Sequence, residues 1–354
     1  MESPTTRCDD ASQPCEDRPL VSVVVPFYNV EECVADCMDS LVHQDFDGYE
    51  VVCIDDGSTD GTGALLDAYA ERYPNVRVFH FPNAGLSVAR NRGVELARAE
   101  LISFVDGDDF VSPYYLSALY RAYDGVEGRM VQGRGIAGTR EKLRKVEWPG
   151  APATAALELL GGSNLKHAFL LGKLRVMAWA RLANRSLYEA VPFVPGMVLE
   201  DLMSMPDIFE RLGELAVLDQ QIYAHVRRRG SITRPDTMTY VLPRDLLHAL
   251  RHTKEVANRW DDEARELLSW RLTRLAASVV GLSTALPDRT DARPYLQEAT
   301  YVIRQHLPQT LVIRRRYRLS WRPIALCVLA LASPRLYGIL RKAKHWLAAH
   351  DLNG

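Results

Sequence analysis

Short apolar runs alternate with helical patterns between residues 21 and 123, and this rhythm constrains the fold more than any other feature of the chain. The apolar runs are Val21–Val25, Glu50–Ile54, Val76–His80 and Leu101–Val105. Strands that alternate with amphipathic helices are typical of a parallel sheet with helices on both faces, and continuous apolar strands indicate burial on both sides. We therefore predict an α/β fold with a Rossmann-like, mostly parallel sheet.

Polar residues follow the carboxyl end of each predicted strand, where open α/β sheets bind their ligands. They are Tyr28 and Asn29 after the first strand, Asp55, Asp56 and Ser58 after the second, Asn83 and Gly85 after the third, and Asp106, Asp108 and Asp109 after the fourth. Loops are generally polar, so each group by itself is compatible with an ordinary turn. Two neighbouring loops that both concentrate carboxylates are better explained by a ligand site.

The segment ISFVDGDDFVS, residues 102–112, contains three of these carboxylates: Asp106, Asp108 and Asp109. Like charges at this spacing raise one another's pKa, so a positive partner is expected nearby. Mg²⁺ or Mn²⁺ would meet this need, because such ions prefer oxygen ligands and complete their coordination with substrate phosphates and water. On this segment alone, an Asp-Gly-Asp turn that binds no metal is an equally good interpretation.

The alternation fades after about residue 129, and the chain becomes helical after residue 242. We expect a surface loop over 134–147, a short helix at TAALELL (154–160), a helix from about Asp201, and two strands at ELAVL (214–218) and QIYAHVRR (221–228). Further helices are predicted over 243–258, 261–284 and 291–306. The predicted organisation is a disordered leader at 1–19, an α/β domain at 20–240 and a helical region with a basic tail at 241–354.

The formal net charge of −2 conceals an uneven distribution. Residues 303–354 hold ten Lys/Arg and one Asp/Glu, so the rest of the chain is acidic. A near-neutral total gives no support for nucleic-acid binding, whereas a basic end on an acidic body favours a local anionic surface.

The cysteine pattern and the N-terminal sequence indicate the cellular compartment of the protein. The six cysteines include no Cys-x-x-Cys pair, and the polar N-terminus has no secretory signal pattern. No apolar run approaches the ~18–20 residues that a membrane-spanning helix needs. We expect reduced thiols and a cytoplasmic protein.

An ordered series of motifs runs from residue 21 to residue 233. The series reads VSVVVPFYN, VVCIDDGSTDGT, NAGLSVARNRG, ISFVDGDDF, LEDL and RRRGSIT. Each motif alone is a weak signal, whereas the ordered set is specific, and it resembles the family 2 glycosyltransferases of the GT-A fold. The resemblance implies a nucleotide-sugar donor, with UDP favoured, a hydroxyl acceptor on a glycan or a lipid-linked saccharide, and a role in cell-surface polysaccharide synthesis.

The same resemblance assigns the carboxylates around a divalent cation, Mg²⁺ or Mn²⁺. Asp108 is the leading ligand of the Asp-x-Asp motif, with Asp106 or Asp109 sharing contact with the metal or the ribose. Asp55 and Asp56 are expected to accept hydrogen bonds from the base and the ribose.

Four further residues are implied as donor-binding. Pro26 and Tyr28 would form the wall of the nucleotide site, because a tyrosine ring suits stacking on a pyrimidine. Arg90 would donate to the nucleotide or the pyrophosphate, although an arginine on a helix surface is the simpler alternative. Arg228 lies in the loop that resembles the family's Arg-x-x-Ser-x-Thr pattern, in which Val226 replaces an expected arginine.

The LEDL motif supplies the implied catalytic residues. Asp201 would be the general base that deprotonates the acceptor hydroxyl as it attacks the anomeric carbon opposite the leaving group, so the reaction would invert configuration. Glu200 is the weaker candidate, and a plain helix cap is the alternative for both. The sequence lacks the Gln-x-x-Arg-Trp motif of processive synthases, which favours transfer of one sugar per encounter.

Two other functions compete with this interpretation. A sugar nucleotidyltransferase has a similar sheet but needs a glycine-rich loop after its first strand, and PFYNVEE contains no glycine. A catalytically inactive nucleotide-sugar-binding relative is disfavoured because Asp56, Asp108 and Asp201 are all present.

The C-terminal tail carries a separate prediction. A short apolar stretch at 324–332 and an amphipathic pattern from Leu336 to Leu347 are flanked by basic residues. Such a pattern suits a helix that lies on an anionic membrane surface, here the inner face of the cell membrane. The alternatives are a helical hairpin packed on the rest of the protein and a homodimer contact.

Overall fold

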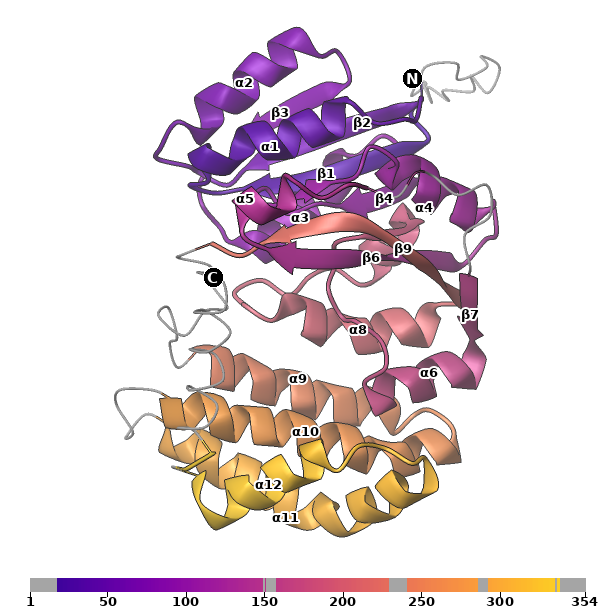
Figure 1. The fold of residues 1–354 in the computed structure, drawn as a ribbon, viewed down its shortest axis with the longest axis vertical. Coiled ribbons are helices and arrows are strands. Elements are labelled where there is room, and N and C mark those ends of the chain that lie inside the picture. The colour runs from indigo at the N-terminus through magenta and orange to yellow at the C-terminus, as the bar shows by residue number, and fades with distance from the viewer. Residues whose placement is uncertain are drawn as a thin grey trace, which may run out of the picture.

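The structure is a computed structural model that describes residues 18–148, 150, 157–228, 241–285, 292–334 and 336–337. Within these residues a nine-stranded sheet carries helices on both faces, and a block of helices extends from one of those faces (Figure 1). The predicted α/β class is therefore confirmed. Among the described residues, no helix is both long and apolar enough to cross a membrane.

The N-terminal half of the sheet is entirely parallel. Its strands are β1 (Val21–Phe27), β2 (Tyr49–Asp55), β3 (Val76–His80) and β4 (Leu101–Phe104). They lie in the order β3-β2-β1-β4, so the four polar strand ends meet at one edge of the sheet. This is the arrangement that the alternating pattern predicts.

The other half of the sheet is mixed. Its strands are β8 (Arg181–Asn184), β6 (Arg129–Gly138), β9 (Glu214–Val226), β5 (Phe110–Val111) and β7 (Leu157–Gly161). Strand β8 is antiparallel to both β4 and β6, whereas β6 and β9 are parallel. The long strand β9 then pairs antiparallel with β5 at one end and with β7 at the other.

Three expectations for this half were wrong. The expected loop at 134–147 begins with the second half of β6 and includes helix α5 (Arg140–Leu143). ELAVL and QIYAHVRR form one continuous strand, and Leu157–Gly161 is an edge strand rather than part of a helix. Pairing with β9 makes strands of Leu157–Gly161 and of the second half of β6, and pairing with β6 along its length keeps β9 continuous, because sheet contacts outweigh weak local preference.

Alternate residues of β1 face two different cores. Val21, Val23 and Val25 belong to the cluster that includes residues of α1 (Glu31–Val42) and α4 (Tyr115–Tyr123). Val24 points the other way, into the cluster that includes α3 (Leu86–Leu96). Burial on both faces explains why the strand is apolar without interruption. Helix α2 (Thr62–Arg72) lies against β3 and α1 at the outer end of the sheet (Figure 1).

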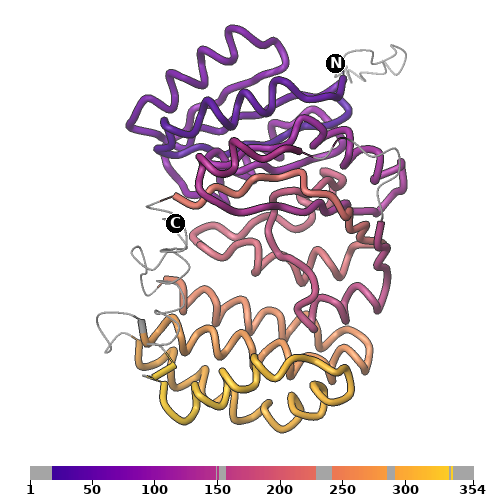
Figure 2. Tube along the Cα trace, viewed as in Figure 1, coloured from indigo at the N-terminus to yellow at the C-terminus, as the bar shows by residue number. Residues whose placement is uncertain are grey.

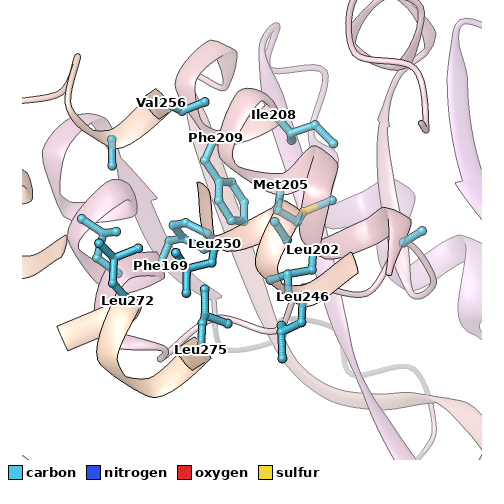
Figure 3. Close-up of a cluster of buried hydrophobic side chains, with 14 of the residues drawn as sticks. Phe169, Leu202, Met205, Ile208, Phe209, Leu246, Leu250, Val256, Leu272 and Leu275 are labelled. Carbon is cyan, nitrogen blue, oxygen red and sulfur yellow. The ribbon is translucent and has the colours of Figure 1, made fainter. Parts of the chain in front are cut away.

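The second core continues from the sheet into the C-terminal helices. The remaining helices are α6 (Gly162–Leu171), α7 (Arg185–Ala190), α8 (Glu200–Arg211), α9 (Val241–Ala257), α10 (Asp262–Ala285), α11 (Arg293–Arg316) and α12 (Arg322–Ala332). Figure 3 shows Phe169 of α6 and Phe209 of α8 beside Leu250 of α9 and Leu272 of α10. The tube in Figure 2 shows the same succession of layers below the sheet.

Some predicted features fall outside the described residues. The predicted domain boundary at residue 240 and the leader up to residue 17 are among them, as is most of the amphipathic segment from Leu336 to Leu347. The domain division therefore stays a prediction.

Close packing of α3 on β1 generates a first testable prediction. A Cβ added at Gly93 would lie 2.1 Å from Cγ1 of Val24, so the helix can approach the strand only with glycine there. We expect Gly93→Ala to lower the free energy of unfolding by ~1–3 kcal/mol, the usual cost of overpacking a core. Urea denaturation measures this loss. Glu95→Ala on the exposed side of the same helix is the control, with an expected change within ~0.5 kcal/mol.

Candidate active site

The loop after β4 lies directly against the end of β1. The backbone N–H of Gly107 donates to the carbonyl of Pro26 at 3.3 Å. A Cβ at Gly107 would lie 2.7 Å from that carbonyl oxygen and 2.5 Å from the ring of Phe27, which explains the glycine between the two aspartates. This close approach places Asp106 and Asp108 at the carboxyl end of β1.

The two aspartates after β2 brace the neighbouring loops. Asp56 accepts hydrogen bonds from the backbone N–H groups of Ala84 at 3.0 Å and Gly85 at 2.7 Å, so its carboxylate holds the loop after β3. Asp55 accepts from the N–H of Ser58 at 3.0 Å and bonds Nδ1 of His80 at 2.8 Å. Burial would raise the pKa of Asp55, but the hydrogen bonds from Ser58 and His80 outweigh it and lower that pKa.

Arg90 is the centre of the site. Its side chain is almost completely buried, and Nη2 donates to Oδ1 of Asp106 at 2.8 Å. Nη1 donates to Oδ1 of Asp201 at 3.0 Å and to Oε1 of Glu200. The guanidinium thus joins the Asp-x-Asp loop to the first turn of α8. Burial would lower the pKa of Arg90, but the negative charges of the three carboxylates outweigh burial and raise that pKa. Sequence reasoning expected Arg90 to contact the donor, but its partners in the structure are these three carboxylates.

The two carboxylates of α8 differ in exposure. Glu200 is buried, and its Oε2 has no hydrogen-bond partner within the described chain, whereas the side chain of Asp201 is 21% exposed. Burial raises the pKa of Glu200 to about 7, although the charge of Arg90 opposes the shift. Burial also raises the pKa of Asp201, again against Arg90. Asp201 is therefore the one of the pair that can meet a substrate hydroxyl.

Asp106 and Asp108 are the two carboxylates that fit a divalent cation. Their side chains are 23% and 22% exposed, and each gives one oxygen to an arginine, Asp106 to Arg90 and Asp108 to Arg228 at 2.7 Å. The second oxygen of each has no protein partner in the described part of the chain. No three His, Cys, Asp or Glu side chains among the described residues are grouped to hold a metal. A cation here would need donor phosphates and water to complete its coordination, as is usual for Mg²⁺.

Asp109, the third predicted metal ligand, is hydrogen-bonded to other residues of the protein. It is buried, and it accepts hydrogen bonds from the hydroxyl of Tyr223 at 2.8 Å and the N–H of Val226 at 2.7 Å, while Nδ1 of His225 lies at 3.1 Å. Burial raises its pKa to about 6. These bonds tie β5 to β9, so the geometry favours a structural role.

Sequence reasoning missed two supports of the site. Trp179 stacks on the ring of Tyr223, with centroids 4.3 Å apart, and His225 continues the stack. Asn91 donates from Nδ2 to the carbonyl of Phe193 and accepts from its N–H, both at 2.9 Å, which fixes the segment before α8. Asn91 is part of the ARNRG motif, so the motif itself was the available signal.

The remaining predicted donor-binding residues flank this centre. Tyr28 lies just beyond β1 and is 49% exposed, so its ring is accessible. Arg228 follows β9 and reaches back to Asp108 across the sheet edge. All the predicted site residues, from Pro26 to Arg228, therefore come from the ends of β1, β2, β4 and β9 and from α3 and α8.

Comparisons with known proteins agree with this geometry. The family profile described as "Glycosyl transferase family 2" matches residues 22–168. Residues 22–168 belong to glycosyl transferase family 2. The chain is also similar to the uncharacterized glycosyltransferase EpsJ of Bacillus subtilis, with 48% identity over 94 residues that make up 27% of each protein. The chain spans less than a third of the length of this relative and of two other curated relatives that it matches.

Solved structures share the fold of this family 2 domain and its helical extension. S. aureus TarS 1–349 in complex with UDP superposes with a TM-score of 0.57 at 20% identity, covering 84% of this chain and 91% of TarS 1–349. The mannosyltransferase PcManGT of Pyrobaculum calidifontis, in complex with GDP-Man and Mn²⁺, gives a TM-score of 0.52 at 17% identity over 92% and 90% of the two chains. The shared fold extends well beyond residue 168.

The raised pKa of Glu200 predicts a pH dependence of stability. Between about pH 4.5 and pH 7, the folded protein keeps a proton on Glu200 that the unfolded chain releases, so this residue makes stability fall as pH rises. Glu200→Gln cannot titrate, so its free energy of unfolding relative to the wild type should increase between pH 5 and pH 7. Urea denaturation at both pH values measures the difference.

The matched control is Glu210→Gln on the same helix. Glu210 pairs with Arg259, and this hydrogen bond lowers the pKa of Glu210. Its contribution to the free energy of unfolding is therefore constant between pH 5 and pH 7. Parallel pH profiles for the wild type and Glu200→Gln would show that Glu200 is ionised throughout.

Proposed function

We propose that the protein is a metal-dependent, inverting glycosyltransferase that moves a sugar from a nucleotide-sugar donor to an acceptor hydroxyl. The observation that carries this proposal is the bridge through Arg90, which joins Asp106 on the expected donor side to Asp201 on α8. A transferase needs its cation and its base on opposite sides of one reacting carbon, and here both carboxylates are hydrogen-bonded to one guanidinium.

The donor is proposed to be a UDP-sugar. Membership of family 2 supports a nucleotide sugar, and the similar structures of TarS and PcManGT are complexes with UDP and with GDP-Man. Tyr28 is exposed beside the loop that begins at Asp55, where a pyrimidine could stack on its ring. Asp106 and Asp108 would hold Mg²⁺ or Mn²⁺, which neutralises charge on the departing diphosphate.

Asp201 acts as the general base in this proposal. Arg90 favours the ionised form of Asp201, while burial raises its pKa toward the range in which a carboxylate accepts a proton efficiently. The acceptor hydroxyl loses its proton to Asp201 as it attacks the anomeric carbon from the face opposite the diphosphate. Glu200 shares Arg90 with Asp201 and fixes the guanidinium from the buried side.

The acceptor is proposed to be a glycan or a lipid-linked saccharide, extended by one sugar per encounter in cell-surface polysaccharide synthesis. The open carboxyl edge of the sheet and the partly exposed Asp201 are compatible with an acceptor of this size. The reaction would take place in the cytoplasm, where nucleotide sugars are available.

Loss of the base should separate catalysis from donor binding. Asp201→Asn should lower transfer by ~10²-fold or more, because general base catalysis contributes that much, while the Kd for UDP changes little. Turnover assays and calorimetry measure the two quantities. Asp207→Asn, further along α8 and paired with His252, should retain activity. Equal losses in rate and UDP affinity would assign Asp201 to the donor site instead, and NMR of the product should show an inverted anomeric centre.

Loss of the cation site should act on the donor. Asp108→Asn keeps the shape of the side chain but removes a charge that a cation needs, so Mn²⁺ should no longer strengthen UDP binding. Calorimetric titration of UDP, GDP and CDP with and without Mn²⁺ tests both the metal and the choice of nucleotide. Asp219→Asn, an exposed residue paired with Arg134, is the control. Undiminished turnover of the wild type in EDTA would exclude metal dependence.

A further inference from the structure

Helices α11 and α12 form the outermost layer of the protein, at the end opposite α2 (Figure 1). Each buries one side of its surface. The buried residues are Ala299, Ile303, Thr310 and Ile313 in α11, and Ile324, Cys327 and Ala330 in α12. The opposite sides of both helices face outward, and the proposed transfer reaction makes no use of them.

Exposed large apolar side chains are concentrated in and beside α11 and α12. Of the fourteen exposed large hydrophobic residues in the described chain, seven lie between 301 and 336. They are Tyr301, Leu311, Val312, Trp321, Leu326, Val328 and Leu336. Scattered apolar residues are normal on a surface, but a concentration of this kind marks a surface that contacts another apolar phase.

Exposed arginines accompany these apolar residues. Arg304 and Arg315 lie on the same exposed stripe of α11 as Tyr301 and Val312, at helical spacing. Arg318 lies in the connection to α12, and Arg322 is the first residue of α12. None of the four arginines forms an ion pair with another residue of the described chain. The sequence has no Asp or Glu between residues 299 and 350, so no acid on this segment neutralises them.

A basic pocket lies between α10 and α12. It has a volume of about 250 Å³. Its basic residues are Arg322 and Arg274, whose Nη1 also donates to the carbonyl of Leu171 at 3.1 Å. Pro323 and Leu326 supply apolar walls, and none of the described residues that line the pocket is a carboxylate. Leu326 and Arg322 are also part of the exposed surface, so the pocket could take a phosphate group whose hydrocarbon chains lie against the apolar residues outside.

We propose that the outward face of α11 and α12 docks the protein onto an anionic phospholipid bilayer. The exposed apolar side chains would enter the interface, and the unpaired arginines would meet lipid phosphates, as in other peripheral amphipathic helices. The pocket between Arg274 and Arg322 would receive one lipid headgroup.

The distribution of charge gives the docking a direction. Residues 1–302 hold 33 Lys/Arg and 44 Asp/Glu, so the rest of the protein is repelled by the surface that attracts this face. A two-fold homodimer through the same face is disfavoured, because it would bring arginines of one copy against arginines of the other without an acid to separate them.

Vesicle co-sedimentation of the full chain tests the proposal. Vesicles of phosphatidylcholine with phosphatidylglycerol should bind the protein, pure phosphatidylcholine should bind it at least tenfold more weakly, and salt should weaken the binding. Arg304→Gln with Arg315→Gln should weaken binding about tenfold or more. Arg72→Gln with Arg98→Gln, the same charge change on exposed residues of the far end, should have no such effect.

Two further comparisons distinguish apolar insertion into the bilayer and headgroup binding in the pocket from general electrostatic attraction to the vesicle. Leu326→Ser with Val328→Ser should weaken binding several-fold, whereas Leu65→Ser, on exposed Leu65 of α2, should not. Arg322→Gln should weaken binding more than Arg318→Gln, because only Arg322 lines the pocket. Point substitutions are required, since deleting residues after Val312 would remove the buried Ile313 and Ile324.

Three results would overturn the proposal. The first is equal binding to both kinds of vesicle, and the second is equal losses for the α11 arginine pair and the Arg72 and Arg98 pair. The third is a mass of two chains by light scattering that the Leu326→Ser and Val328→Ser variant loses, which would assign the face to a homodimer. Each measurement is independent of glycosyl transfer, so it can fail while the proposed reaction stands.

Discussion

The buried guanidinium of Arg90 is the interaction on which the site depends. It forms ion pairs with three carboxylates from two parts of the chain that are more than ninety residues apart. Asp106 belongs to the first part, and Glu200 and Asp201 belong to the second. Removing one partner from such a buried group costs ~3–5 kcal/mol, because the charges that remain are left uncompensated. The rings of Phe193 and Phe104 pack beside Arg90, with centroids 5.3 and 6.0 Å from the central carbon of its guanidinium.

Backbone hydrogen bonds from side chains hold the loops around this centre. Asp56 binds the loop after β3, Asn91 binds the segment before α8, and Asp109 binds the end of β9. Each of these side chains belongs to a motif that the sequence displays, yet each acts on another part of the chain. The loops are therefore positioned before any ligand arrives, which is the condition for efficient electrostatic stabilisation of a reaction.

The helical layers extend the same support to α8. Its first turn carries Glu200 and Asp201, while Leu202, Met205 and Phe209 face the core shared with α9 and α10 (Figure 3). Because this core is continuous with the sheet, the C-terminal helices fix the position of the candidate base as well as presenting the outward face of α11 and α12. One set of helices thus links the proposed chemistry to the proposed membrane contact.

Local periodicity was sufficient for the parallel half of the sheet and for the order of the motifs, because a strand buried on both faces must be apolar throughout and its ligand-binding loop must follow its carboxyl end. The ordered motifs, through their resemblance to the family 2 glycosyltransferases, indicated the candidate residues from Pro26 to Arg228. The tertiary structure alone decided that Leu157–Gly161 pairs with β9 as a strand and that the carboxylate of Asp109 accepts its hydrogen bonds from β9. It alone decided that Arg90 meets Asp201. These outcomes depend on contacts between residues distant in sequence, and no local pattern encodes the energy of a partner that only folding brings within reach.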